Sequence, residues 1–162
     1  KIIFKNNVID NNKRKICLQN IKTDNIIRVV KGPQYDYFAQ NSIKEFFTFP
    51  FTISNNTDRM GMRLEGYKIE NIKSYNIPSE GIIKGSIQVT GDGNPIVLMA
   101  DHPTIGGYPK IASVISTDIS KLSQLSPGKE INFKKIEIFE AEKAFYKNEN
   151  NLVKLFNQIE VN

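Results

Sequence analysis

The alternation of hydrophobic and polar positions predicts a chain built mainly from short β-strands. Apolar, β-branched runs bounded by turn residues are typical of strands. Such runs occupy residues 26–30, 49–53, 60–64, 82–83, 85–89, 95–100 and 111–117. A further alternating run covers 131–139, and the slip at Lys134-Lys135 predicts a β-bulge there. The pattern therefore favours a mainly β fold.

Helical spacing appears in three places. Aromatic and aliphatic residues recur at helical intervals over 35–47, where Asn41-Ser42 could divide the segment into two short helices. Asp118 is a candidate cap for a short helix over 118–124. The segment 140–157 predicts a terminal amphipathic helix, which is either a packing element or a contact for a partner.

The stretch 85–110 carries the densest candidate chemistry. Two strands meet at the turn Gly91-Asp92-Gly93-Asn94, whose residues tolerate positive φ. Adjacent glycines in the following loop allow close approach of a ligand, and their N–H groups can form an anion-binding concavity. A small polar substrate with a carbonyl or a carboxylate suits this loop, which holds Asp101, His102, Thr104, Gly106, Gly107, Tyr108 and Lys110.

A second group of polar residues precedes this stretch. Four charged residues of opposite sign lie within eight positions: Asp58, Arg59, Arg63 and Glu65. They form either an ion-pair ladder that fixes a loop or a fork-like grip of arginine on a carboxylate or carbonyl. Gln88 lies inside an apolar strand, so its amide either ties down a neighbouring loop or faces a ligand.

The single histidine and the single cysteine constrain the chemistry. His102 is a candidate general base. Because there is no second histidine and no carboxylate cluster, we expect no metal site. Cys17 lies in an apolar triplet, which favours a buried structural thiol over a nucleophile. One cysteine fits a reducing compartment, so we expect a cytoplasmic protein.

Composition narrows the partner classes. The chain has 162 residues, enough for one domain with its own core, and a net charge of +5. The lysines are spread along the sequence, which argues against nucleic-acid binding. No run approaches the length of a membrane span, and no signal peptide is visible. Because the first residue is Lys1, we expect a trimmed chain or a piece of a longer one.

Five segments in order carry a resemblance to a known family. They are RVVKGPQYDYF, SNNTDRMGMRLEG, SEGIIKGSIQV, GNPIVLMADHPTIGGYPKIASVIS and LSQLSPG. From about Arg28 to Ala141 the chain resembles the C-terminal half of the allophanate hydrolase subunit 2 family, also called the biotin-dependent carboxyltransferase family. The resemblance implies a cyclophilin-like β-barrel with one or two short helices. We expect an N-terminal extension or remnant over 1–25, the barrel over 26–141 and a C-terminal helix over 142–162.

The resemblance also implies an activity. Family members include urea amidolyase and the C subunit of 5-oxoprolinase, and they work with a KipI-like subunit 1. Together they transfer carboxyl from carboxybiotin or support ATP-dependent opening of 5-oxoproline, so the substrate is a small amide, urea or lactam. We expect no tightly bound cofactor on this chain, because biotin sits on a partner and no GxxxxGK loop is present.

On these chemistries we assign roles to the motif positions. Arg59 and Arg63 would bind a carboxylate, the N–H groups of Gly106 and Gly107 would stabilise an oxyanion, and Asp101 or Lys110 would handle protons. The alternative is a non-catalytic regulatory module, like the KipA protein that antagonises a kinase inhibitor. A third alternative is a product that folds but has lost activity.

Overall fold

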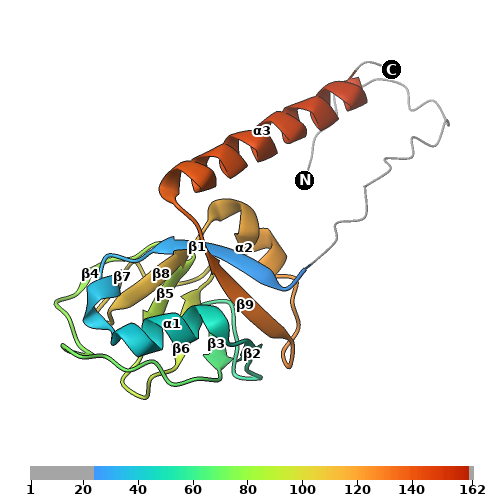
Figure 1. Cartoon of the computed structure of the whole chain (residues 1–162). Coiled ribbons are helices and arrows are strands. Elements are labelled where there is room, and N and C mark those ends of the chain that lie inside the picture. Colours follow the sequence, from blue (N-terminus) through green and yellow to red (C-terminus); the bar gives the residue numbers. More distant parts are fainter. Residues whose placement is uncertain (1–23, 161–162) are drawn as a thin grey trace.

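A closed β-barrel forms the body of the molecule in the computed structural model, which describes residues 24–160 (Figure 1). The order around the barrel is β1-β8-β5-β6-β3-β2-β9. Neighbouring strands run antiparallel except β1 and β9, whose parallel pairing closes the barrel. The barrel strands are β1 (Ile26–Lys31), β2 (Phe51–Ile53), β3 (Gly61–Glu65), β5 (Ser86–Val89), β6 (Pro95–Leu98), β8 (Lys110–Val114) and β9 (Glu130–Lys135).

The remaining elements lie outside the barrel wall. A two-stranded sheet pairs β4 (Glu80–Gly81) with β7 (Ile105–Gly106). The helical elements are the 3-10 helix η1 (Tyr35–Tyr37), α1 (Gln40–Thr48), α2 (Ser116–Leu122) and α3 (Ile138–Glu160). The mainly β barrel with few helices and a C-terminal helix, predicted from the sequence, is therefore confirmed.

Aromatic residues join α1 to the barrel core. Phe46 of α1 stacks on Phe133 of β9 with ring centroids 4.6 Å apart, and it also contacts Phe51 of β2 at 5.6 Å. Phe46 and Phe51 are fully buried. Burial of rings of this size contributes more to the core than any single aliphatic residue. These aromatic contacts therefore hold α1 against β2 and β9.

Three local predictions need correction. The segment 35–47 is divided as predicted, but the break lies at Phe38, which is extended and bridges to Asn71. The run 131–139 is not one strand, because β9 ends at Lys135 and α3 begins at Ile138. The bulge predicted at Lys134-Lys135 is absent, since both residues pair in register with β1; the irregularity that the structure does have lies at Ile87/Gln88.

Asp118 does not cap α2. The helix begins at Ser116, and the Asp118 carboxylate, 3% exposed, binds the guanidinium of Arg28 on β1 at 2.5 Å and 3.0 Å. A buried carboxylate needs such partners to replace the water that it loses. Because Asp118 lies on α2 and Arg28 on β1, their ion pair fastens the helix to the strand.

None of the described helices has a stretch long and apolar enough to cross a membrane. The predictions for residues 1–23, including Cys17, lie outside the described residues.

Candidate functional site

A row of side chains crosses neighbouring strands on the outer face of the barrel. Arg63 of β3 is paired with Ile96 of β6, and Ile96 is paired with Gln88 of β5. Gln88 is in turn paired with Lys110 of β8, at the register irregularity. Residues paired across a ladder point to one side of the sheet. Their neighbours along β3, β5 and β6 belong to the buried core, so the row Arg63–Ile96–Gln88 faces outward.

Lys110 is held in a buried polar network. Its side chain is 4% exposed, and its ammonium contacts the Glu80 carboxylate from β4. The Gln34 amide donates to the same carboxylate at 2.8 Å and accepts from the Lys110 backbone N–H at 3.1 Å. The hydrogen bond from Lys110, and to a smaller extent the one from Gln34, hold the pKa of the Glu80 carboxyl below its ordinary value. We call Gln34, Glu80 and Lys110 the closed network, since it ties β4 to the barrel.

The glycine loop packs against Gln88. Gly106 is a ladder residue of β7, opposite Glu80, and a Cβ placed on it would lie 2.7 Å from the Gln88 amide nitrogen. That nitrogen donates to the carbonyl of Tyr108 at 3.4 Å. The carbonyl of Gly107 accepts the N–H of Ile77 at 2.9 Å. Gln88 thus ties down the loop that follows β7, and the close approach at position 106 favours glycine.

Thr104 lies just before β7, where its carbonyl accepts the N–H of Ile82 at 3.1 Å. Its side chain is exposed, as is that of Tyr108, which is 40% exposed. Of the predicted loop residues, Gly106, Gly107 and Tyr108 therefore lie beside the outer face of the barrel near Gln88.

Arg59, Asp101 and His102 lie beyond the ends of β3 and β6. Arg59 Nε donates to Asp101 Oδ2 at 2.6 Å and the guanidinium donates again to Oδ1 at 3.1 Å. This pair is exposed, and Arg59 lowers the pKa of the Asp101 carboxyl, which favours its charged form. His102 Nδ1 lies 2.6 Å from the carbonyl oxygen of Pro103. Arg59 therefore pairs with Asp101 and does not line the same pocket as Arg63.

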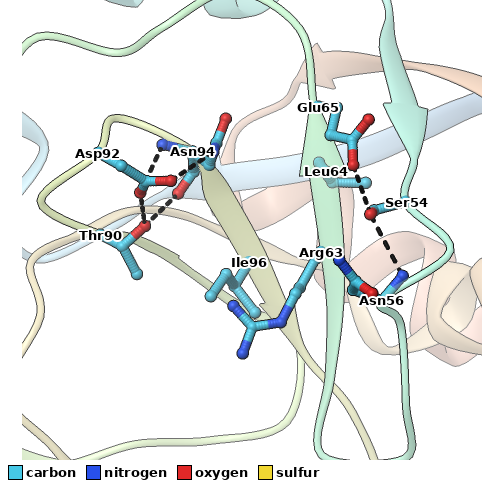
Figure 2. A pocket seen from close by; sticks show the side chains of 9 residues that line it. All are labelled: Ser54, Asn56, Arg63, Leu64, Glu65, Thr90, Asp92, Asn94 and Ile96. Carbon is cyan, nitrogen blue, oxygen red and sulfur yellow. Dashed lines mark hydrogen bonds between the residues drawn. The ribbon is translucent and has the colours of Figure 1, made fainter.

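A polar pocket of about 180 Å³ surrounds Arg63 (Figure 2). The Arg63 guanidinium lies beside Ile96, on the side away from the Ser54–Glu65 hydrogen bond of 2.5 Å. Across the pocket, Asp92 accepts hydrogen bonds from Thr90 and Asn94. Among the described residues, Arg63 forms no ion pair. It is therefore a free fork-shaped donor on the same face as Gln88, suited to a carboxylate or a carbonyl oxygen.

The predicted group of four opposite charges does not form a ladder. Asp58 accepts the backbone N–H groups of Met60 and Gly61, and Glu65 accepts from Ser54. Among the described residues, no group of three or more His, Cys, Asp or Glu side chains could hold a metal ion.

Residues 5–135 match the family model described as the carboxyltransferase domain, subdomains A and B. The chain belongs to this carboxyltransferase family. It is 37% identical to the 5-oxoprolinase C subunit of Haemophilus influenzae over 137 residues, which are 85% of this chain and 44% of that protein. It is 39% identical to the same subunit of Escherichia coli over 120 residues, 74% of this chain and 39% of that protein.

The fold agrees with a solved carboxyltransferase relative. The crystal structure of the Kluyveromyces lactis urea amidolyase matches with a TM-score of 0.76 and 27% identity, covering 80% of this chain and 8% of that one. The resemblance to this family that the sequence motifs indicated is therefore confirmed. The chain spans less than half the length of the two 5-oxoprolinase subunits that it matches.

Within this carboxyltransferase domain, two residues of the closed network were missed by sequence reasoning. Gln34 follows a Gly-Pro pair and Glu80 precedes a glycine, so both resemble ordinary turn residues. The one available signal is indirect: if Lys110 is buried, its ammonium needs an acceptor, and a carboxylate from a distant segment is the usual one.

Proposed function

We propose that the chain is a component of a heteromeric amide- or lactam-processing enzyme and that its outer barrel face binds the substrate. The observation that carries the proposal is the position of Arg63, a cation without a described ionic partner, on the same face as Gln88. Arg63 and Gln88 stand two strands apart, about 10 Å at the backbone. Membership of the carboxyltransferase family supports the reaction class.

The chemistry of the two side chains defines the substrate. A guanidinium binds a carboxylate or a polarised carbonyl through two parallel hydrogen bonds. The Gln88 amide carries both a donor and an acceptor, and Gln88 Nε2 already approaches the Tyr108 carbonyl. Gln88 is 6% exposed and its amide holds the loop that follows β7, so Arg63 is the exposed contact, suited to a small molecule with a carboxylate or carbonyl end. The substrate class is therefore a small amide, urea or lactam.

The names of the relatives support a multi-subunit assembly. Two of them are named as a subunit of 5-oxoprolinase, so we infer a complex with a KipI-like subunit 1. Carboxybiotin on a partner or ATP bound in the complex would supply the activation chemistry. We infer a cytoplasmic location from the single cysteine of the sequence.

The test is turnover of 5-oxoproline with ATP, and of urea with bicarbonate and a biotin-carrying partner, with and without the KipI-like subunit. We expect activity only when both proteins are present. In that complex, Arg63→Ala should lower kcat/KM at least about ten-fold, since it removes a charge-assisted grip. Arg59→Ala is the matched control and should retain activity. An unchanged kcat/KM in Arg63→Ala would overturn the site.

A regulatory binding module is the second candidate function. It is favoured by the engagement of two of the three predicted acid or base residues, Asp101 with Arg59 and Lys110 with Glu80. A module of this kind needs no acid or base of its own. Tight association with the KipI-like subunit, no turnover of either substrate, and a loss of association in Arg63→Ala would support this candidate over the enzyme.

A further inference from the structure

The C-terminal helix α3 carries an apolar stripe that stays exposed. In Figure 1, α3 leaves the end of β9, passes over α2 and extends away from the barrel. Large apolar side chains on one side of the helix are each 40% exposed or more: Ile138, Phe145, Tyr146, Leu152 and Val153. An amphipathic helix usually packs such a stripe on its own domain. Here the stripe is left for contact with another molecule.

The side of α3 that faces the barrel is basic instead. Lys143 and Lys147 line a groove whose other wall is formed by Arg28 of β1, Thr117 of α2 and Lys134 of β9. Successive residues of a helix are turned by about 100°, which places the two lysines on the side of α3 opposite to the stripe. The helix therefore turns its cations toward its own domain and its apolar residues away from it.

Two carboxylates lie along the middle of the stripe. Glu142 and Glu149 are seven positions apart, so they stand on one line of the helix, about 10 Å from each other. Both are exposed, and neither forms an ion pair within the described part of the chain. Neighbours on a helix surface lie three or four positions apart, and around these two glutamates all such positions are apolar or aromatic. The helix itself thus supplies no cation to the stripe.

The carboxylates decide which kind of molecule can cover the stripe. Burial of a carboxylate without a cation is unfavourable. A second copy of this chain would bring the same two carboxylates, while its Lys143 and Lys147 would face its own barrel. A lipid bilayer would surround Glu142 and Glu149 with hydrocarbon. A partner helix with lysine or arginine within its own apolar stripe meets both the apolar and the ionic requirement.

We propose that the stripe of α3 is the docking surface for a basic amphipathic helix of another protein. The apolar side chains of that helix pack on Phe145, Tyr146, Leu152 and their neighbours. Its cations, spaced by about seven positions, pair with Glu142 and Glu149. The stripe lies outside the pocket around Arg63, so the proposal goes beyond the proposed function and does not rest on it.

Fluorescence anisotropy of a labelled synthetic peptide, titrated with the full chain, tests the proposal. The peptide is a helix of about three heptads with leucine at the a and d positions and lysine at the flanking positions. A second peptide has glutamate in place of every lysine. We expect saturable binding of the lysine peptide that weakens with salt, and no binding of the glutamate peptide.

Charge reversal on the stripe should reverse this preference. The double variant Glu142→Lys/Glu149→Lys should weaken binding of the lysine peptide at least about ten-fold and gain binding of the glutamate peptide. Glu70→Lys/Glu130→Lys makes the same change in net charge at exposed positions outside α3. It is the matched control and should bind both peptides as the unchanged chain does.

The apolar part of the stripe is tested separately. Tyr146 and Val153 are 67% and 55% exposed, so Tyr146→Ser/Val153→Ser should leave the urea denaturation midpoint of the chain unchanged. The same variant should weaken binding of the lysine peptide at least about ten-fold, because it removes apolar contacts from the centre of the surface.

Several outcomes would overturn the proposal. The first two are the absence of saturable binding at low salt and an equal loss of affinity in Glu70→Lys/Glu130→Lys. A dimer in sedimentation velocity that Tyr146→Ser/Val153→Ser dissociates would assign the stripe to a second copy. Displacement of the peptide by phosphatidylcholine vesicles would assign it to a membrane. Arg63→Ala should bind the lysine peptide as the unchanged chain does, so failure of this surface and failure of the outer-face site are distinguishable.

Discussion

Two polar regions share the outside of the barrel, and they use their charges in opposite ways. In the closed network, the side chain of Lys110 is 4% exposed and is matched by Glu80 and Gln34. In the pocket beside β3, Arg63 is exposed and has no ionic partner among the described residues. A buried charge must be matched for the fold to be stable, whereas an exposed unmatched cation costs the fold little. The first region therefore holds the structure and the second is available to a ligand.

The largest effect is expected from Glu80→Leu. It leaves the Lys110 ammonium buried without its carboxylate, so we expect a loss of about 2 kcal/mol in the free energy of unfolding. This is below the range for a fully buried pair, because the Glu80 side chain is 42% exposed and partly screened by water. Urea denaturation measures the loss. Lys110→Met removes the buried charge itself and should cost less; the reverse order would contradict the structural role of the network.

The pH dependence of stability should report the same pair. The pKa of Glu80 is lower in the folded protein than in the unfolded chain, where it is about 4.3. The pair therefore stabilises the protein fully above that pH, and the contribution disappears as the pH falls through the lower folded pKa.

We expect acidification from pH 7 to pH 3 to cost the unchanged chain more stability than Glu80→Gln, which cannot titrate. The two unfolding free energies should converge at the acidic end. Parallel curves across the whole range would contradict the assignment.

A smaller effect is expected at Gly106. A methyl group there would lie 2.7 Å from Gln88 Nε2 and 3.1 Å from Ile82 Cδ1, both ends of side chains that can shift. We expect Gly106→Ala to lower the free energy of unfolding by about 1 kcal/mol. Gly81→Ala, in the paired strand, places its methyl group with nothing within 4 Å and serves as the control. Equal stabilities of the two variants would show that the loop does not pack closely on Gln88.

The fold was accessible from the sequence because its strands follow local patterns. Short β-branched runs and turn residues placed most of the barrel strands, and the motif order indicated the family. The end of β9 was missed because Ile136 and Ile138 continue the strand alternation, although helix α3 begins at Ile138. Periodicity over so few residues does not separate a strand from a following helix.

The candidate site was less accessible, because its contacts join distant segments. Arg59 and Arg63 are four positions apart and looked equivalent, yet within residues 24–160 only Arg59 meets a carboxylate, 42 positions away at Asp101. Lys110 was predicted to handle protons, but its ammonium forms an ion pair with Glu80, 30 positions away. No local pattern encodes such pairings, which depend on how β4, β6 and β8 come together.

The smallest effects are expected from the exposed arginines. Arg59 and Asp101 are 80% and 49% exposed, so Arg59→Ala should leave the urea denaturation midpoint unchanged, as should Arg63→Ala. The two variants should differ in the titration of Asp101, followed by NMR of its side-chain carboxyl. Because Arg59 lowers that pKa, Arg59→Ala should raise it toward the ordinary value, whereas Arg63→Ala should leave it unchanged. A rise in both variants would mean that Arg63 also reaches Asp101, and the distinction between a paired and a free arginine would be lost.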